Sequence, residues 1–589
     1  MTQRPCPDLG LAQVLQQCLL QFSTDIAIEQ HWHTVTFREL HHSAVAVAQK
    51  LRQHGVKKEE PVPILAARGI NHVIAQVAIV YAGGSCVPLD VGLPDGRIAE
   101  LVRHLGSSVA LVDSDNVERC PAVTQVAINY NSVQGINGHN GHLEDGGRGI
   151  SDNGPATCSH IFHTSGSTGK PKAVRVLAKG LLNLVFNEFS PVDRGSRLGH
   201  VCNIGFDVSM WEIWSSLLYG ATLVVFDQDE ILDVSVFRRK LRRERIDVLW
   251  QTTSLLAMVA RIDPTVYASV DTLVTGGEAI NIASTKQIFA SGPPRRLYNA
   301  YGPTELSVLA TYHKISAADA ESGSIPIGRP LSGYQVFLVD ENIQAVLDGQ
   351  VGELVVGGIG VAGGYFRNPE KTSAVFISAK HLCAGKLYRT GDLIRKNDVG
   401  FLEYVGRRDN EVKISGQRVE LESVERCLLE TGLVSEAAAL KVSEQEAGTV
   451  STLVAYVVPC NGTTLDPASL HVAYKRTAPY LMTPRLRLVS VLPLTASGKV
   501  DRAQLDRQYS VELRGTIQER KKLRGQFENR ETHLRRLWGE ALGLDPASIT
   551  PDDNFFSIGG TSLHIARINA ISLHEWFRRR SIGAMGKEL

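Results

Sequence analysis

Short apolar runs alternate with helical patterns along the first part of the chain. Thr36 and Glu39 have the spacing of a capping box, and apolar residues recur at helical spacing through residues 40–51. Apolar runs follow at residues 61–65 and 82–89, with a helical pattern between them. Alternation of strand and helix signals predicts parallel α/β layering. We therefore expect an α/β protein.

Composition and charge narrow the class of protein. The 589 residues, 43% of them hydrophobic and 21% charged, are typical of a globular chain of roughly three to four folding units. Lys+Arg 62 against Asp+Glu 61 leaves no net field that would attract nucleic acid or an anionic membrane. The start lacks a signal-peptide core, and no apolar run could span a bilayer. Nine cysteines without a Cys-x-x-Cys pair argue against a disulfide scaffold or a zinc site. We expect a cytoplasmic protein with neither nucleic-acid nor membrane partners.

A loop rich in glycine, hydroxyl groups and lysine follows an apolar run at residues 162–174. Glycines let backbone N–H groups converge on an anion, hydroxyls add donors and lysines add charge. The P-loop NTPase motif is excluded, because no Gly-Lys-Ser/Thr follows Gly166 at the required spacing. An ordinary surface loop rich in Ser and Thr is the alternative. The candidate phosphate-binding residues are Thr164, Ser165, Gly166, Ser167, Thr168, Gly169 and Lys172.

This loop closely resembles the phosphate loop of the AMP-forming adenylating enzymes, which include acyl-CoA synthetases, luciferases and nonribosomal peptide synthetase adenylation domains. Further stretches match in the family's order, at residues 299–305, 388–392, 406–409 and 492–502. The resemblance covers nearly the whole chain. It implies that the protein uses ATP and Mg²⁺.

The resemblance also implies roles for individual residues. Tyr301 would lie near the adenine, Thr304 would contact the α-phosphate, and Glu305 would hold Mg²⁺, which needs only one or two carboxylates beside phosphate oxygens. Asp392 would accept hydrogen bonds from the ribose hydroxyls, and Arg407 would reach the nucleotide. The implied catalytic residues are Lys499, Thr164, Lys172 and Glu305, of which Lys499 would bridge the substrate carboxylate and the α-phosphate.

Asp207 lies among apolar residues at positions 205–212. A buried carboxylate is costly unless a cation pairs with it, whereas a solvated aspartate at a helix N-cap is the alternative. In the resembled family an aspartate here holds the α-ammonium of an amino acid. The lining is apolar with two indoles, which favours a hydrophobic amino acid of modest size, although each residue could be ordinary core. The implied substrate residues are Asp207, Val208, Trp211, Trp250, Val274, Gly276, Ala300, Val308 and Leu309.

The resemblance divides the chain into a large adenylate-forming subdomain at 1–408 and a small α+β subdomain at 409–508, with Asp409 as the hinge. A linker at 509–528 and a partial helical carrier domain at 529–589 would follow. Ser562 lies in a stretch that resembles the attachment site of peptidyl carriers, where a helix N-terminus favours the phosphate of 4′-phosphopantetheine. Because only 27 residues follow Ser562, we expect a truncated carrier or an incorrectly assigned chain end.

These expectations combine into one function. The chain would activate an amino acid as aminoacyl-AMP and load it as a thioester on a carrier phosphopantetheine, as nonribosomal peptide synthetases do in secondary metabolism. The carrier would act in cis or in trans, with a phosphopantetheinyl transferase and downstream tailoring or release enzymes as partners. The alternatives are an acyl- or aryl-CoA ligase, which Asp207 disfavours, and a catalytically idle assembly subunit, which Lys172, Glu305, Asp392 and Lys499 disfavour.

Overall fold

The computed structural model describes residues 9–130, 154–164, 172–189, 192–408, 411–414, 417–444, 450–460, 465–478, 481–493, 500–511, 535–539, 542 and 545–550. The helices of the first half are α1 (Leu11–Gln21), α2 (Phe37–Gln53), α3 (Ile70–Ala82), α4 (Asp95–Leu105), α6 (Ala178–Val185), α7 (Val208–Tyr219), α8 (Gln228–Leu232), α9 (Val234–Arg243), α10 (Thr253–Ile262) and α11 (Ile282–Ser291). Those of the second half are α12 (Ala317–Ser322), α13 (Pro369–Val375), α14 (Leu421–Glu430) and α15 (Pro467–Thr477), with 3₁₀ turns η1 (Val266–Ser269), η2 (Thr304–Leu306) and η4 (Pro546–Ser548).

The predicted capping box starts α2. The Thr36 side chain accepts a hydrogen bond from the Glu39 backbone N–H, and the Glu39 carboxylate accepts one from the Thr36 N–H. These bonds satisfy donors that a helix N-terminus otherwise leaves free. The helix then buries the apolar face that the spacing predicts, including Leu40 and Leu51.

The two apolar runs become neighbouring parallel strands. Residues 61–65 form β3 with the predicted bounds. The second run is shorter as a strand than the sequence predicts, because Ala82 still belongs to α3 and Gly83 ends that helix in the left-handed region at φ 90°. The strand β4 therefore covers only Ser85–Pro88.

These strands belong to the first of two mostly parallel sheets in the large subdomain. Its order in the described part of the chain is β6-β5-β3-β4-β7-β8. The strands are β3 (Pro61–Leu65), β4 (Ser85–Pro88), β5 (Val109–Val112), β6 (Thr124–Ala127), β7 (Cys158–Thr164) and β8 (Lys172–Leu177). The β7–β8 pair is antiparallel and places Thr164 and Lys172, which flank the predicted phosphate loop, side by side at the edge of this sheet.

The second sheet carries four of the nine predicted substrate residues, namely Trp250, Val274, Gly276 and Ala300. Its order is β15-β14-β13-β12-β11-β9-β10-β1-β2, and β9 to β13 run parallel, so that their carboxyl ends share one edge. Ligands of open α/β sheets bind at that edge. The strands are β1 (Ile26–Gln30), β2 (His33–Thr36), β9 (Arg197–His200), β10 (Thr222–Val225), β11 (Val248–Thr252), β12 (Thr272–Gly276), β13 (Arg296–Tyr301), β14 (Thr311–Lys314) and β15 (Arg329–Pro330).

An antiparallel sheet completes the large subdomain, and a separate smaller unit follows. The antiparallel sheet pairs β16 (Tyr334–Val339), β17 (Val351–Gly358), β19 (Lys386–Lys396), β18 (Phe376–Ser378) and β20 (Leu402–Arg407). The small unit holds the hairpin β21 (Glu411–Ile414) and β22 (Gln417–Glu420), and the sheet β23 (Val434–Glu444), β24 (Val450–Pro459) and β25 (Arg485–Leu488).

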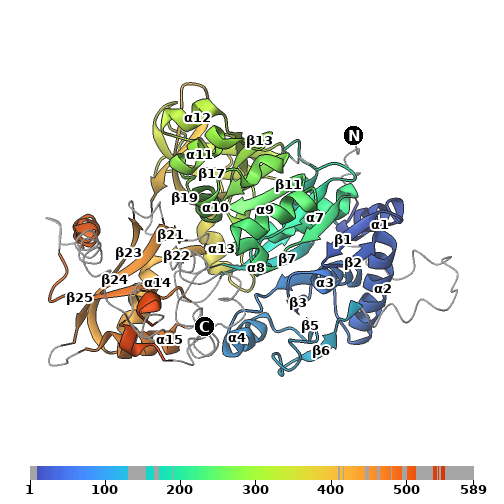
Figure 1. The fold of residues 1–589 in the computed structure, drawn as a ribbon, viewed down its shortest axis with the longest axis horizontal. Coiled ribbons are helices and arrows are strands. Elements are labelled where there is room, and N and C mark those ends of the chain that lie inside the picture. The colour runs from blue at the N-terminus through green and yellow to red at the C-terminus, as the bar shows by residue number, and fades with distance from the viewer. Residues whose placement is uncertain are drawn as a thin grey trace.

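Figure 1 shows α14, α15 and β23 to β25 gathered beside the large subdomain. Their apolar side chains form core clusters of their own, apart from the large core. The predicted fold class is confirmed: a large α/β unit is followed by a small α+β unit. No helix within the described ranges is both long and apolar enough to cross a bilayer.

Candidate adenylate-forming site

The ends of the predicted phosphate loop lie side by side. Thr164 ends β7 and Lys172 begins β8, and the two residues are register partners in the antiparallel pair. The predicted residues between them, Ser165, Gly166, Ser167, Thr168 and Gly169, lie outside the described residues.

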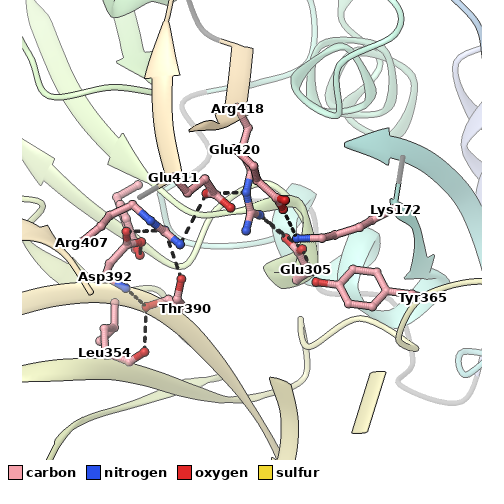
Figure 2. Close-up of polar contacts among 11 residues, drawn as sticks. Lys172, Glu305, Leu354, Tyr365, Thr390, Asp392, Arg407, Glu411, Arg418 and Glu420 are labelled. Carbon is pink, nitrogen blue, oxygen red and sulfur yellow. Dashed lines mark hydrogen bonds and ion pairs between the residues drawn. The ribbon is translucent and has the colours of Figure 1, made fainter. Parts of the chain in front are cut away.

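Glu305 is fully buried in η2, directly after β13. The Tyr365 hydroxyl donates a hydrogen bond to its Oε1 over 2.7 Å, and Arg418 Nη1 lies 3.2 Å from its Oε2 (Figure 2). Burial alone would raise the pKa of Glu305, but the charge of Arg418 and the Tyr365 hydrogen bond outweigh it and lower that pKa. The residue predicted to hold Mg²⁺ is therefore an ionised carboxylate facing a cation.

Lys172 is also paired with the small subdomain. Its Nζ lies 2.6 Å from Glu420 Oε1, and the two side chains are only 12% and 6% exposed. Burial raises the pKa of Glu420, although Lys172 opposes that effect. Arg418 makes a second ion pair with Glu411 of the same hairpin, at 2.5 Å from Nε to Oε1. Figure 2 shows Arg418 and Glu420 of β22 pointing at Glu305 and Lys172 of the large subdomain.

The predicted nucleotide residues meet on adjacent strands. Asp392 of β19 and Arg407 of β20 are register partners, and Arg407 Nη1 donates a hydrogen bond to Asp392 Oδ1 over 2.7 Å. The Tyr301 hydroxyl donates to the other carboxylate oxygen of Asp392. Burial, and then the nearby Asp392 charge, raise the pKa of Tyr301. The predicted adenine and ribose contacts thus form one hydrogen-bonded group.

Asp207 is half-buried at the start of α7, and its side chain does not cap the helix. Burial raises the pKa of Asp207, whereas a hydrogen bond with Thr304 and the charge of Lys413 act to lower it. The contact with Thr304 places the predicted ammonium site directly beside the predicted phosphate contact. A carboxylate in this position can hold an ammonium group next to the reacting phosphate.

The predicted side-chain lining gathers around two indoles. The rings of Trp211 in α7 and Trp250 in β11 are 5.3 Å apart between centroids. Trp250 pairs in register with Val274 of β12, and Gly276 pairs with Ala300 of β13. Val308 and Leu309 are buried in the same core, and Val208 is half-buried in the first turn of α7.

Sequence reasoning missed three charged residues that contact the predicted site residues or the loop that carries Asp207: Glu212, Arg418 and Glu420. Glu212 of α7 is fully buried and accepts hydrogen bonds from His200 Nδ1 at 2.7 Å and from the backbone N–H groups of Val201 and Cys202 at 3.2 Å. It thereby fixes the loop that leads to Asp207. The available signal in the sequence was a single charged residue, Glu212, in a helix whose other residues are uncharged. For Arg418 and Glu420 there was none, because their partners are far away in the sequence.

Besides residues 165–169 of the predicted phosphate loop, three further predicted residues lie outside the described residues: Lys499, the hinge Asp409 and the attachment serine Ser562. Their roles stay predictions. Upstream of Ser562, Trp538 and Leu542 of the predicted carrier helix are both buried.

The comparisons with known proteins agree with the resemblance. The sequence model of the AMP-binding enzyme family matches residues 15–366, and that of the phosphopantetheine attachment site matches residues 532–570. Aldehyde reductase lnaA of Aspergillus flavus is 36% identical over 94% of this chain and 53% of its own length. Nonribosomal peptide synthetase asaC of the same species is 35% identical over 91% of this chain and 52% of its own length. The chain thus spans about half the length of these relatives.

Among solved structures, holo-PA1221, described as a nonribosomal peptide synthetase protein containing adenylation and carrier domains, has a similar fold. Its TM-score is 0.80 at 24% identity, and the match covers 99% of this chain and 96% of that chain. Tyrocidine synthase 3 of Brevibacillus parabrevis is 32% identical over 97% of this chain and 8% of its own length. The chain belongs to the AMP-binding enzyme family, as an adenylation domain fused to a carrier domain.

Proposed function

We propose that this chain activates a hydrophobic α-amino acid as aminoacyl-AMP and transfers it to the thiol of its carrier phosphopantetheine. The observation that carries the proposal is the position of Asp207 at the start of α7, where its carboxylate lies near Thr304 and therefore near the buried Glu305. An ammonium group held by Asp207 leaves the substrate carboxylate close to the nucleotide phosphates. An acid without an amino group would gain nothing from this carboxylate.

The first half-reaction needs no general base, because an amino acid carboxylate is already ionised at neutral pH. A carboxylate oxygen forms a bond to the α-phosphorus of ATP while the bond to the pyrophosphate oxygen breaks. The residues of the site act by positioning and by neutralising charge. Thr164 and Lys172 would contact phosphate oxygens, and Asp392 and Arg407 would orient the nucleotide. Lys499 would bridge the substrate carboxylate and the α-phosphate.

The donor set fits the Mg²⁺ that this family uses with ATP. One carboxylate completes a magnesium site when phosphate oxygens supply further ligands, and Glu305 is ionised and flanked by groups that also suit phosphate. When bound, the ion would neutralise charge on the leaving pyrophosphate.

The position of the small subdomain bears on the second half-reaction. In this arrangement Arg418 already pairs with Glu305 and Glu420 with Lys172. Mg²⁺ would therefore compete with Arg418 for Glu305, and the phosphate groups of ATP would compete with Glu420 for Lys172. We propose that the small subdomain turns about Asp409 between two arrangements. One would present Lys499 for adenylation, and the other, with β21–β22 on the site, would serve thioester formation.

Partners and location are further proposals. A phosphopantetheinyl transferase would load Ser562, and a release or tailoring enzyme would take the product; a relative named as an aldehyde reductase supports release by reduction in a longer protein. We propose a cytoplasmic location on the sequence grounds given above.

Amino-acid-dependent ATP–pyrophosphate exchange, measured with the proteinogenic amino acids and with common aryl and fatty acids, tests the proposal. We expect exchange with one largely apolar amino acid. The variant Asp207→Ala should have a lower kcat/KM for that amino acid, equivalent to a loss of about 3–5 kcal/mol in transition-state stabilisation, because it leaves a desolvated ammonium group unpaired. Exchange only with acids that lack an amino group would favour an acyl- or aryl-CoA ligase. If the folded protein shows no exchange with any acid, the result would favour a catalytically idle assembly subunit.

A further inference from the structure

Two buried indole N–H groups lack hydrogen-bond partners. Trp211 is 1% exposed and Trp250 is 2% exposed, and neither Nε1 atom has an acceptor within the described structure. Buried tryptophan normally finds a partner for this group, because leaving it unpaired costs free energy. Trp214, also on α7, behaves as expected: its Nε1 donates to Gln76 Oε1 over 2.9 Å.

Both unpaired donors lie in the region that our proposed function assigns to the substrate side chain. The two rings contact each other at 5.3 Å between centroids. A Cβ atom added to Gly276 would lie 3.4 Å from Trp250 Cζ2. Because Cζ2 and Nε1 are bonded to the same ring carbon, the N–H edge of Trp250 lies near Gly276.

The sequence keeps side-chain atoms away from this edge. A Cβ at Gly276 would meet the Ala300 carbonyl oxygen at 2.4 Å, so a larger residue would clash with backbone. The other neighbours, Val274 and Ala300, are buried and apolar and supply no side-chain acceptor. Among the described residues neither indole N–H has an acceptor, so an oxygen of a bound molecule can serve as one.

We propose that the substrate is an α-amino acid whose otherwise apolar side chain carries a neutral oxygen that accepts hydrogen bonds from Trp211 and Trp250. The inference rests on the proposed function and narrows its substrate class. A hydroxyl or carbonyl oxygen has two lone pairs, enough for both donors. A side-chain carboxylate is disfavoured, because the apolar lining would leave its charge uncompensated.

Matched amino-acid pairs test the proposal in the ATP–pyrophosphate exchange assay on the full chain: tyrosine against phenylalanine, threonine against valine, and glutamine against methionine. The preferred substrate should carry a side-chain oxygen. Its partner without that oxygen should show at least a tenfold lower kcat/KM, because the site would then leave its donors unpaired. This ratio is measured on the parent protein and does not depend on any variant folding.

The variants Trp211→Phe and Trp250→Phe keep an aromatic ring but remove the N–H group. Each should reduce the preference for the oxygen-bearing amino acid at least severalfold, because kcat/KM for that amino acid falls more than kcat/KM for its apolar partner. Trp214→Phe is the matched control, since its N–H is bonded to Gln76, and Trp32→Phe on the surface is a second control. Both controls should leave the ratio unchanged.

Each other outcome overturns the inference. Preference for a purely apolar amino acid would overturn it while leaving the proposed function in place. An unchanged ratio in both indole variants would mean that the N–H groups do not reach the substrate, for instance because each faces the neighbouring ring. Absence of exchange with any amino acid would overturn the proposed function and, with it, the inference.

Discussion

Asp207 shows how one side chain depends on its surroundings for its chemistry. Burial raises the pKa of its carboxyl group, and the Thr304 hydrogen bond and the Lys413 charge only partly oppose that effect. A bound ammonium group would favour the ionised form and reverse the shift. Substrate binding and the protonation of Asp207 should therefore be linked.

A pH profile of kcat/KM for the amino acid checks this link, because that parameter reports groups of the free enzyme. As the pH is lowered, kcat/KM should fall when Asp207 becomes protonated. Because the pKa of Asp207 is raised, this fall should begin at a higher pH than it would for an aspartate of ordinary pKa, about 3.9. Below that point Asp207 is neutral and no longer attracts the ammonium group. Burial also raises the pKa of Glu420, so a variant must identify the group. The variant Asp207→Asn should no longer show this fall of kcat/KM at low pH. If the variant shows the same fall, another residue is the titrating group.

At the scale of elements, α7 does more than cover the sheet. Its buried Glu212 binds the end of β9 through His200 and the backbone N–H groups of Val201 and Cys202. Burial lowers the pKa of His200, while Glu212 opposes that effect. The helix thus holds, through one carboxylate, the loop from which Asp207 projects.

Replacing Glu212 by glutamine keeps the size of the side chain but weakens these hydrogen bonds. Glu212→Gln should lower the free energy of unfolding by about 1–3 kcal/mol, measured by urea denaturation. It should also raise KM for the amino acid more than KM for ATP, because only the Asp207 loop is released. Glu321→Gln, which removes an exposed partner of Lys286, is the control and should cost less than about 1 kcal/mol. Equal effects on both substrates would show that Glu212 has no particular connection with the Asp207 loop.

At the scale of the whole molecule, the small subdomain places its β21–β22 hairpin against the predicted metal and phosphate contacts. Arg418 takes the position of a cation at Glu305, and Glu420 takes that of an anion at Lys172. The protein itself therefore satisfies charges that ATP and Mg²⁺ would otherwise satisfy. Nucleotide binding and this arrangement of the subdomains should compete.

The variant Arg418→Met tests the competition. General electrostatics predicts weaker ATP binding when a positive charge is lost, whereas competition predicts tighter binding, because Glu305 is left free for the metal. We expect the Kd for Mg²⁺ with a non-hydrolysable ATP analogue to fall about tenfold, a change of about 1.4 kcal/mol by calorimetry. Arg395→Met, which removes a partner of Glu403, is the control and should leave the Kd unchanged. Weaker binding in Arg418→Met would contradict the competition.

Local elements and the residues of the family's motifs could be predicted from the sequence alone. The capping box at Thr36, the strand at residues 61–65 and each of the motifs that contain the predicted nucleotide residues depend on interactions or patterns within a short stretch. The second strand came out shorter than its apolar run, because Gly83 ends a helix inside that run. Such boundaries depend on packing as much as on local preference.

Which charged side chains form ion pairs depends on the complete fold. Lys172 and Glu420 are 248 positions apart, and Glu305 and Arg418 are 113 positions apart. No periodicity links residues at such separations, since ion pairs of this kind depend on how one folded unit lies against another. The unpaired indoles show the same limit. The family resemblance predicted both tryptophans near the substrate, but only the fold shows that Trp211 of α7 contacts Trp250 of β11 and that neither N–H has a partner among the described residues. Local chemistry was readable along the chain, whereas complementarity between distant segments exists only in the fold.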